Sequence, residues 1–438
     1  MRLRSATFIL LAGLVPAATA AAQTPLTLAD AVARARANNP DAGSSAAAER
    51  EAAQRVVQAR AGYLPTVDLV ESWQRGNQPV FVFSSLLAQR QFTAADFALE
   101  ALNHPAAIDN FRSAVTVEQP LIDAATRAHV SAARIGRAVA AASRLVVDQD
   151  LAVRVTDVFG RVLAAAGARR SADAAVATAL ADRELAANRR EAGMSTDADV
   201  LQIDLHVART RERQVLATAE ERIARIRLNE VMGEPLDEVF VLAPPAAAVV
   251  DTGDAAALEA TALRDRPEVA LASLHEDLAR AGESAARAAF LPKVSLQGGW
   301  ELNGGTWNGR ASSWVAGAVA RVNVFRGFAD RARLAEARDL TARRALERRK
   351  ADTAARVDVH VALAALDAAR ASEAVGRDAV TQARESQRII RDRYEAGLSD
   401  VASLLRSAEA VVQADAQQIA AQVAALTAAT ALHRALGR

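Results

Sequence analysis

Two long stretches of the sequence contain no proline and almost no glycine, the residues that most often end an α-helix. They are residues 121–192 and 326–396. As single helices rising about 1.5 Å per residue, they would be about 108 and 106 Å long. A globular domain does not accommodate an element of that length, whereas a coiled-coil rod or tube does. The sequence therefore predicts an elongated, mainly helical protein.

Each long stretch ends in a copy of the same short turn. Residues 189–195 read RREAGMS and residues 393–399 read RYEAGLS. The glycine can take the left-handed conformation that ends a helix, the next apolar residue usually packs back onto the last turn, and the serine can cap the following helix. These positions are Gly193, Met194 and Ser195 in the first copy and Gly397, Leu398 and Ser399 in the second. Each long helix should therefore fold back as a hairpin.

The turns belong to a larger duplication. Leu64-Pro65 recurs 227 positions later as Leu291-Pro292, and further along the offset is 204. A period this long, present twice, indicates a duplicated domain. The change of offset places 23 extra residues in the first copy. The predicted divisions are a signal peptide (1–22), a first repeat (23–233), an equatorial linker (234–253) and a second repeat (254–438).

The two arms of each hairpin differ in length. The return helices, residues 196–232 and 400–436, are about half as long as the helices that precede them. Helices at residues 41–62 and 267–289 can supply the missing length by stacking end to end with them. Each repeat then presents two nearly continuous helical columns.

Alternating apolar and polar residues predict one strand pair in each repeat. The predicted strands are residues 66–74, 111–119, 293–302 and 313–324. Strands of about ten residues suit a tilted span of a bilayer. Three of the four tryptophans lie on or beside the strands and Trp307 lies in the loop between the last two. An aromatic girdle at a membrane interface and an ordinary sheet core both explain that placement.

The extra residues of the first copy lie in the loop 75–110. Thr93 and Asp96 have the spacing of a capping box, which predicts a short helix there. The apolar stretch Val80–Leu87 either extends a strand or packs under the loop.

Four strands in a bilayer require more than one chain. An open sheet edge in lipid leaves backbone N–H and C=O groups unpaired, at several kcal/mol each. The smallest closed bacterial barrels have eight strands, so two chains would give eight and three would give twelve. If the strands lie in a membrane, the protein is an oligomer in contact with lipid.

Composition narrows the class of function. Arg2 and Arg4, the apolar run 6–17 and small residues near Ala20 predict a secretory signal. The 53 Lys and Arg residues balance 52 Asp and Glu, which gives no support for nucleic-acid binding. There is no cysteine, so disulfides, thiol catalysis and a lipid anchor on cysteine are excluded. The six histidines have no metal-ligand spacing, and no catalytic or cofactor-binding constellation is found. The sequence predicts a protein that is not an enzyme.

Taken together, the sequence resembles the TolC-like outer-membrane efflux proteins along nearly the whole mature chain. The residues that carry the resemblance are LTLADA at 26–31, NNP at 38–40, the two Leu-Pro pairs and YEAGLS at 394–399. The resemblance implies a mainly α fold with a small membrane β part: a homotrimer in which two β-hairpins per chain form a twelve-strand outer-membrane barrel above a periplasmic α-barrel. It also implies a passive exit duct whose hairpin tips dock a periplasmic adaptor, with an inner-membrane transporter as the indirect partner.

The resemblance also points to residues at a closed periplasmic entrance. Asp199 matches the acidic position of the first copy, whereas the two acids usual in the second copy fall on Ser403 and Arg406. Three copies of Arg406 near the axis would favour anions; alternatively, Arg406 points outward and pairs with Glu409 or Asp400. Tyr394 matches a position that ties the entrance helices together, or it is packing filler.

A second class of function fits the same helices. A periplasmic coiled-coil adaptor or structural rod would need the alternating segments to form a small sheet domain instead of membrane strands. Drugs, metal ions and secreted proteins all leave through ducts of the first kind.

Overall fold

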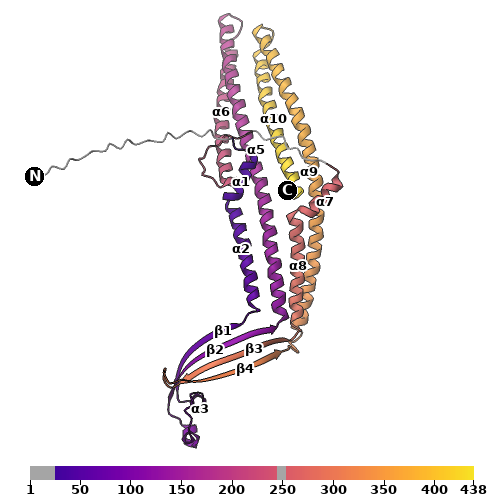
Figure 1. Ribbon diagram of the computed structural model, residues 1–438. Helices are drawn as coiled ribbons and strands as arrows, with labels where there is room; N and C mark the ends of the chain where they lie inside the picture. The colour runs from indigo at the N-terminus through magenta and orange to yellow at the C-terminus, as the bar shows by residue number, and fades with distance from the viewer. Residues whose placement is uncertain (1–24, 244–252) are drawn as a thin grey trace, which may run out of the picture.

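The computed structural model describes residues 25–243 and 253–438, and the predicted signal peptide lies outside them. The helices are α1 (Leu28–Asn38), α2 (Pro40–Ala61), α3 (Pro79–Ala88), the 3-10 turn η1 (Ala94–Phe97), α4 (Leu99–Asn103), α5 (Ala124–Glu191), α6 (Asp197–Met232), α7 (Ala255–Asp265), α8 (Pro267–Ala288), α9 (Ala329–Glu395) and α10 (Val401–Ala435), and the strands are β1 (Thr66–Gly76), β2 (Ile108–Ile122), β3 (Lys293–Gly304) and β4 (Ala311–Arg321). The helices form one long bundle with the sheet at one end and two hairpin tips at the other (Figure 1).

The two longest helices confirm the predicted rod. Helix α5 has 68 residues and α9 has 67, about 102 and 100 Å at the usual rise. Both begin three residues later than predicted. Strand β2 runs on to Ile122, so α5 starts only after Asp123, whose side chain accepts the Ala125 N–H. Helix α9 starts after Phe328, which has a φ of 65°.

Shorter helices complete the bundle as predicted. Helices α2 and α6 both run along α5, and α8 and α10 both run along α9 (Figure 1). Asn39 caps α2 and its amide also donates to the Val231 carbonyl at 2.8 Å, which joins the start of α2 to the end of α6.

A glycine stands at each of these joints. Gly233 has a φ of 71°, and a Cβ on it would lie 2.7 Å from the Asn38 carbonyl oxygen. Gly437 has a φ of 80°, and a Cβ on it would lie 2.5 Å from the Asp265 carbonyl oxygen. Only a residue without a side chain fits so close to another backbone. The two joints are therefore equivalent, as a duplicated chain requires.

The core consists mostly of small and aliphatic side chains. One cluster lies around Val155 and Phe159 of α5 and a second around Val359 of α9, both at the level of the joints. Helix α10 approaches α5 closely because glycines face it: a Cβ on Gly160 would lie 2.8 Å from Val423. Alanine and glycine thus set the spacing between the two hairpins.

The four strands form one antiparallel sheet in the order β1-β2-β3-β4. Its register sorts the residues onto two faces. One face carries apolar rows across all four strands, one of which consists of Leu69, Val115, Trp300 and Trp314. The other face is mostly polar and carries an ion pair between Arg112 and Glu301.

One strand end differs from the prediction, and the exposure of the tryptophans bears on the two interpretations of their placement. Strand β4 ends at Arg321, so the predicted strand 313–324 was too long at its end. Trp314 is 78% exposed and Trp73 is 61% exposed, so these rings do not form a packed sheet core in this chain. That outcome favours the girdle interpretation.

The loop between β1 and β2 holds three short helical elements. The capping box of Thr93 and Asp96 is present and starts η1, as predicted. Of the two interpretations of Val80–Leu87, the strand extension is wrong, because this stretch is helix α3, which begins with Pro79.

Two further searches concern the helices and the side chains. Within residues 25–243 and 253–438, no helix is both long and apolar enough to cross a membrane. In the same residues, no cluster of three or more His, Asp or Glu side chains could hold a metal ion.

Candidate functional site: the seam between the hairpins

The two hairpin tips have the backbone geometry that the sequence predicts. Gly193 and Gly397 are left-handed, with φ of 72° and 77°. In the first copy the Met194 N–H donates to the Arg189 carbonyl at 2.8 Å, and in the second the Leu398 N–H donates to the Arg393 carbonyl at 2.8 Å. Each long helix therefore ends in the same hydrogen-bonded motif.

Two details of the tips differ from the prediction. Met194 and Leu398 are 60% and 77% exposed, so they do not pack back onto the last turn. Ser195 and Ser399 do not cap the return helices, because the residue after each serine does so: Thr196 caps α6 and Asp400 caps α10.

Asp199 closes the first turn of α6. Its carboxylate accepts hydrogen bonds from the Thr196 N–H at 2.9 Å, from the Thr196 hydroxyl at 2.9 Å and from the Ser195 hydroxyl at 3.1 Å. The bonds from the Thr196 backbone and hydroxyl lower the pKa of Asp199 below its ordinary value. Asp199 is therefore a charged capping residue that does not touch Tyr394.

Tyr394 is buried and lies against the first hairpin. The Arg189 guanidinium of α5 lies 4.8 Å from the centre of the Tyr394 ring. The same guanidinium donates to the carbonyl oxygens of Tyr394 and of Glu395, the latter at 2.8 Å, at the end of α9. It also donates to Met194 O at 3.3 Å in its own turn. Arg189, only 8% exposed, thus joins both tips.

Sequence reasoning missed Arg189. The available signal was a basic residue in the last turn of a helix, a position from which it can reach terminal carbonyls. That signal does not say that the carbonyls belong to another helix. The Tyr394 hydroxyl has no hydrogen-bond partner among the described residues, so the ring, together with the backbone, makes the contact.

Arg406 and Ser403 lie on the first two turns of α10. Arg406 is exposed and donates to the Ser403 hydroxyl at 3.0 Å. Glu409 pairs with Arg213 of α6 at 2.8 Å, and Asp400 accepts the Ser403 N–H at 2.8 Å. Among the described residues, Arg406 forms no ion pair with Glu409 or Asp400.

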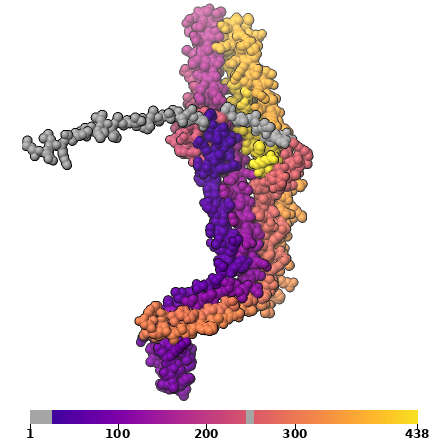
Figure 2. All heavy atoms as spheres, in the orientation of Figure 1, coloured from indigo at the N-terminus to yellow at the C-terminus, as the bar shows by residue number. Residues whose placement is uncertain are grey.

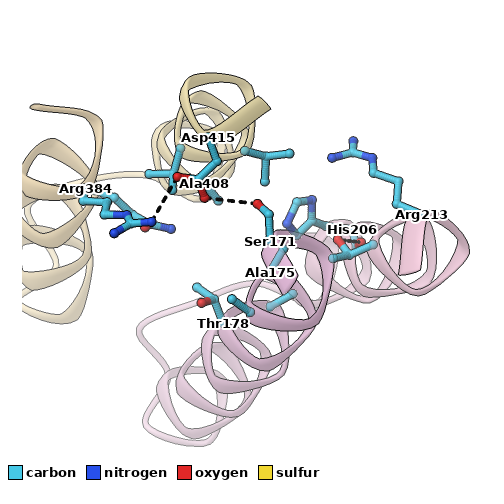
Figure 3. A pocket seen from close by; sticks show the side chains of 14 residues that line it. Ser171, Ala175, Thr178, His206, Arg213, Arg384, Ala408 and Asp415 are labelled. Atoms are coloured by element: carbon cyan, nitrogen blue, oxygen red, sulfur yellow. Dashed lines mark hydrogen bonds and ion pairs between the residues drawn. The ribbon is translucent and has the colours of Figure 1, made fainter. Parts of the chain in front are cut away.

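Further polar contacts cross between the hairpins below the tips. The Ser171 hydroxyl of α5 donates to Asp415 of α10 at 3.1 Å, and Arg384 of α9 donates to the same carboxylate at 3.0 Å (Figure 3). A cavity of about 230 Å³ beside them is also lined by Thr178 and His206. Burial lowers the pKa of His206, so this ring stays neutral near pH 7.

A buried acid lies between this cavity and the tips. Asp182 of α5 is 1% exposed and forms an ion pair with Arg391 of α9 at 3.2 Å. Burial raises the pKa of Asp182, and the charge of Arg391 opposes that rise. We call this set of inter-hairpin contacts, at Arg189, Asp182, Arg213 and Asp415, the seam.

The seam contains no arrangement typical of catalysis. Its acids pair with arginines or accept hydrogen bonds from hydroxyls. Within the described residues, the side chain of its histidine forms no hydrogen bond to a nucleophilic side chain. What the arrangement can do is hold two long hairpins side by side, through exchangeable polar contacts beside a buried apolar cluster that includes Ile203, Tyr394 and Leu404. Such contacts can be broken and remade with water at modest cost.

Three comparisons place the chain among known proteins. The family model described as outer membrane efflux protein matches residues 31–234 and 258–438. Protein CyaE of Bordetella pertussis is 31% identical over 304 residues, which cover 67% of this chain and 64% of that protein. The pyoverdine export outer membrane protein OpmQ of Pseudomonas putida is 28% identical over 416 residues, covering 92% of this chain and 84% of that protein.

Solved structures agree with the fold. The outer membrane protein VceC of Vibrio cholerae superimposes with a TM-score of 0.77 at 17% identity, covering 94% of this chain and 96% of that one. The open state of the MtrE outer membrane channel of Neisseria gonorrhoeae has a TM-score of 0.77 at 18% identity, covering 94% and 88%.

Proposed function

The chain belongs to the outer membrane efflux protein family, and we propose that three copies of it form the outer-membrane exit duct of a tripartite export system. In this proposal the duct is passive. An inner-membrane transporter supplies the energy, and a periplasmic adaptor joins that transporter to the hairpin tips.

The observation that carries the proposal is the sheet with two unlike faces and two free edges. One face is mostly apolar and exposed, apart from the row that contains Glu71 and Ser113, and the other is mostly polar. Strand β1 pairs only with β2, and β4 pairs only with β3, in the part of the chain that the structure describes. In lipid, both edges need partners. Pairing β1 of one copy with β4 of the next satisfies them, turns the apolar face outward, and gives twelve strands from three copies.

The domain division is part of this proposal. The first repeat, 23–233, and the second, 254–438, each supply one hairpin and one strand pair, joined by the linker 234–253. The equivalent joints at Gly233 and Gly437 support the division. The described part of the linker lies at the same level, where the Leu26 N–H donates to the Val241 carbonyl at 2.7 Å.

The route to the outer membrane is proposed from the sequence. Residues 1–22 would direct export and be removed. Anchoring would then rest on the strands, because the chain has no cysteine to carry a lipid.

The tips form the periplasmic entrance in this proposal. The exposed side chains of Met194 and Leu398 are available to an adaptor. Arg406, exposed at the start of α10, would place three positive charges near the axis and favour the passage of anions.

A matched pair of substitutions on β4 tests the proposal. Ala316 lies on the apolar face and its neighbour Gly317 on the polar face, and both are exposed. Ala316→Lys would place a charge in lipid, at a cost of about 2–4 kcal/mol near the middle of the bilayer. Gly317→Lys would place the charge in the lumen. A Cβ at position 317 meets no atom within 4 Å, so the substitution causes no clash. We expect Gly317→Lys to pellet with outer membrane as a heat-modifiable trimer and Ala316→Lys to lose assembly.

Two outcomes would contradict the proposal. Equal assembly of the two variants would mean that the apolar face does not meet lipid. A wild-type protein that is monomeric and soluble without detergent would leave only the alternative of a periplasmic rod or adaptor.

A further inference from the structure

The connection between β1 and β2 is far longer than its counterpart in the second repeat. Residues 77–107 join β1 to β2, whereas residues 305–310 suffice to join β3 to β4. We call residues 77–107 the strap. The strap lies at the end of the sheet farthest from the helices, which is the outer end in the proposed orientation (Figure 1).

The base of the strap is fastened to the polar face of the sheet. Gln89, at the end of α3, donates to the Asn110 side chain at 3.1 Å and to the Asp109 carbonyl at 2.9 Å. The Asn110 amide in turn donates to the side chain of Asn303 at 3.1 Å. Asn110 and Asn303 share their face with Arg112 and Glu301, because residues two apart on a strand point the same way.

The strap also reaches the far edge of the sheet. Arg90 donates to the Ser312 carbonyl of β4 at 2.9 Å. The strap thus leaves the end of β1, passes β2 and β3, and is held at β4. Gln89 of the strap is buried, as are Asn110 and Asn303 of the sheet.

The body of the strap is built to keep its shape. Helix α3 starts at Pro79, and its residue Phe83 forms an edge-to-face stack with Phe92, which stacks in turn on Phe97. A preformed unit of this size, anchored on the lumen side of a sheet, takes up space that a short turn would leave open. Figure 2 shows it as a separate projection from the sheet.

From these contacts we propose that the strap is a size filter at the outer mouth of the duct. This inference rests on the proposed function, because it needs the polar face to line a lumen. Three straps, one from each chain, narrow the outer opening, so that small solutes pass freely and large ones only when the strap moves. Pore diameter then determines which cargo can leave.

The test uses the absence of cysteine from the chain. Thr116→Cys places one thiol on the polar face, two rows below Arg112, and Asn308→Cys places one in the exposed turn between β3 and β4. Intact cells are treated from outside with a small charged maleimide or with a maleimide on a polyethylene glycol chain of about 5 kDa, and labelling rates are compared.

Two variants remove the filter to different extents. In the first, residues 77–107 are replaced by a copy of the turn 305–310. In the second, Gln89→Ala is combined with Arg90→Gly, which removes both anchors. Glycine suits the φ of 57° at position 90, so the second variant adds no backbone strain.

At Thr116→Cys we expect the small reagent to label the protein with the intact strap, the strap replacement and the double variant at rates within about twofold of one another. The large reagent should label the strap replacement about tenfold or more faster than the otherwise wild-type protein, with the double variant between them.

The outcomes separate this inference from the proposed function. Asn308→Cys should be labelled by both reagents in every background. Failure there would mean that this end of the sheet does not face outward, which would overturn the proposed orientation. Failure of the small reagent at Thr116→Cys, even in the strap replacement, would mean that the polar face lines no open lumen. If both sites label as expected but the large reagent reacts equally with and without the strap, the size filter is refuted and the duct proposal stands.

Discussion

Replacing Arg189 with alanine should loosen the contact between the two hairpin tips more than any other single change in the seam. The substitution removes the two hydrogen bonds that cross from α5 to the terminal carbonyls of α9, together with the stacking on Tyr394. A hydrogen bond from a charged donor contributes about 1.5–3 kcal/mol, and a cation–π contact about 0.5–1 kcal/mol.

The lower ends of these ranges apply. Glu395, whose carbonyl accepts one of the two bonds, is an exposed residue in the last turn of α9, where water replaces the guanidinium once it is gone. Two hydrogen bonds and one cation–π contact at these values lose about 3.5 kcal/mol per chain. At 1.4 kcal/mol per factor of ten, the balance between joined and separated tips shifts about 300-fold.

The neighbouring residue provides a matched control. Arg190 pairs with Asp197 of α6, which belongs to the same hairpin, and both side chains are mostly exposed. Arg190→Ala therefore removes an arginine from the same helical turn without touching the contact between hairpins. An exposed pair of this kind contributes at most about 1 kcal/mol.

The assay is single-channel recording in planar bilayers on proteins first shown to form the same heat-stable oligomer. Arg189→Ala should open more often or to a higher conductance than wild type, and Arg190→Ala should behave like wild type. Arg189→Lys should resemble alanine more than arginine, because the compact ammonium lacks the planar fork with which the guanidinium lies over the ring and reaches carbonyls of both tips. If Arg189→Ala and Arg190→Ala give the same recordings, the reasoning is wrong.

Three other predictions concern the joints, the buried acid and the entrance charge. Gly233→Ala should lower the temperature at which the oligomer dissociates on heated gels, since its Cβ would clash with the Asn38 carbonyl, whereas Gly136→Ala, in open space within a helix, should raise it slightly. Burial raises the pKa of Asp182 above 3.8, so the folded wild-type protein should lose stability as pH rises from that value through the raised pKa. Asp182→Asn should make stability depend less on pH. A difference in stability between the two proteins that stays constant from pH 4 to 7 would count against this prediction. Arg406→Asp should shift single-channel selectivity toward cations, and reversal potentials that do not move would argue that Arg406 lies away from the axis.

The extent of the long helices could be predicted from the sequence because helix ends are marked locally. The glycines of the two tips end α5 and α9 within one residue of the predicted position. Their starts were less accurate, because they depend on how far a neighbouring strand continues. Asp123, which caps α5, reads in the sequence as one more polar residue in a helix.

The choice of cap at each tip shows a limit of residue type. Serine is a good cap, but the residue that caps is the one whose side chain reaches an N–H two or three positions ahead. Thr196 does this together with Asp199, and Asp400 does it with Ser403. The preceding serines are one position too early.

Helix α3 was missed for a different reason. Residues 80–87 are apolar except for the adjacent pair Ser84 and Ser85, and two neighbouring polar positions do not distinguish a helical period from a strand. Pro79, at the first position of the helix, was the usable signal.

The seam could not be predicted at all. Its partners lie about 200 to 240 positions apart in the chain, as with Asp182 and Arg391 or Ser171 and Asp415. Asp182 also has an arginine, Arg183, directly after it in the sequence, so the sequence does not single out Arg391 as its partner. Only the packing of one hairpin on the other decides which pairs form.

The duplicated joints have a consequence for symmetry. If three chains assemble, the helical tube has six nearly equivalent units around its axis, while the straps, present only in the first repeat, repeat three times. The periplasmic end then offers a ring of six tips in two alternating kinds, marked by Met194 and Leu398. A protein bound at that end meets pseudo-sixfold symmetry, whereas cargo leaving at the other end meets a threefold opening.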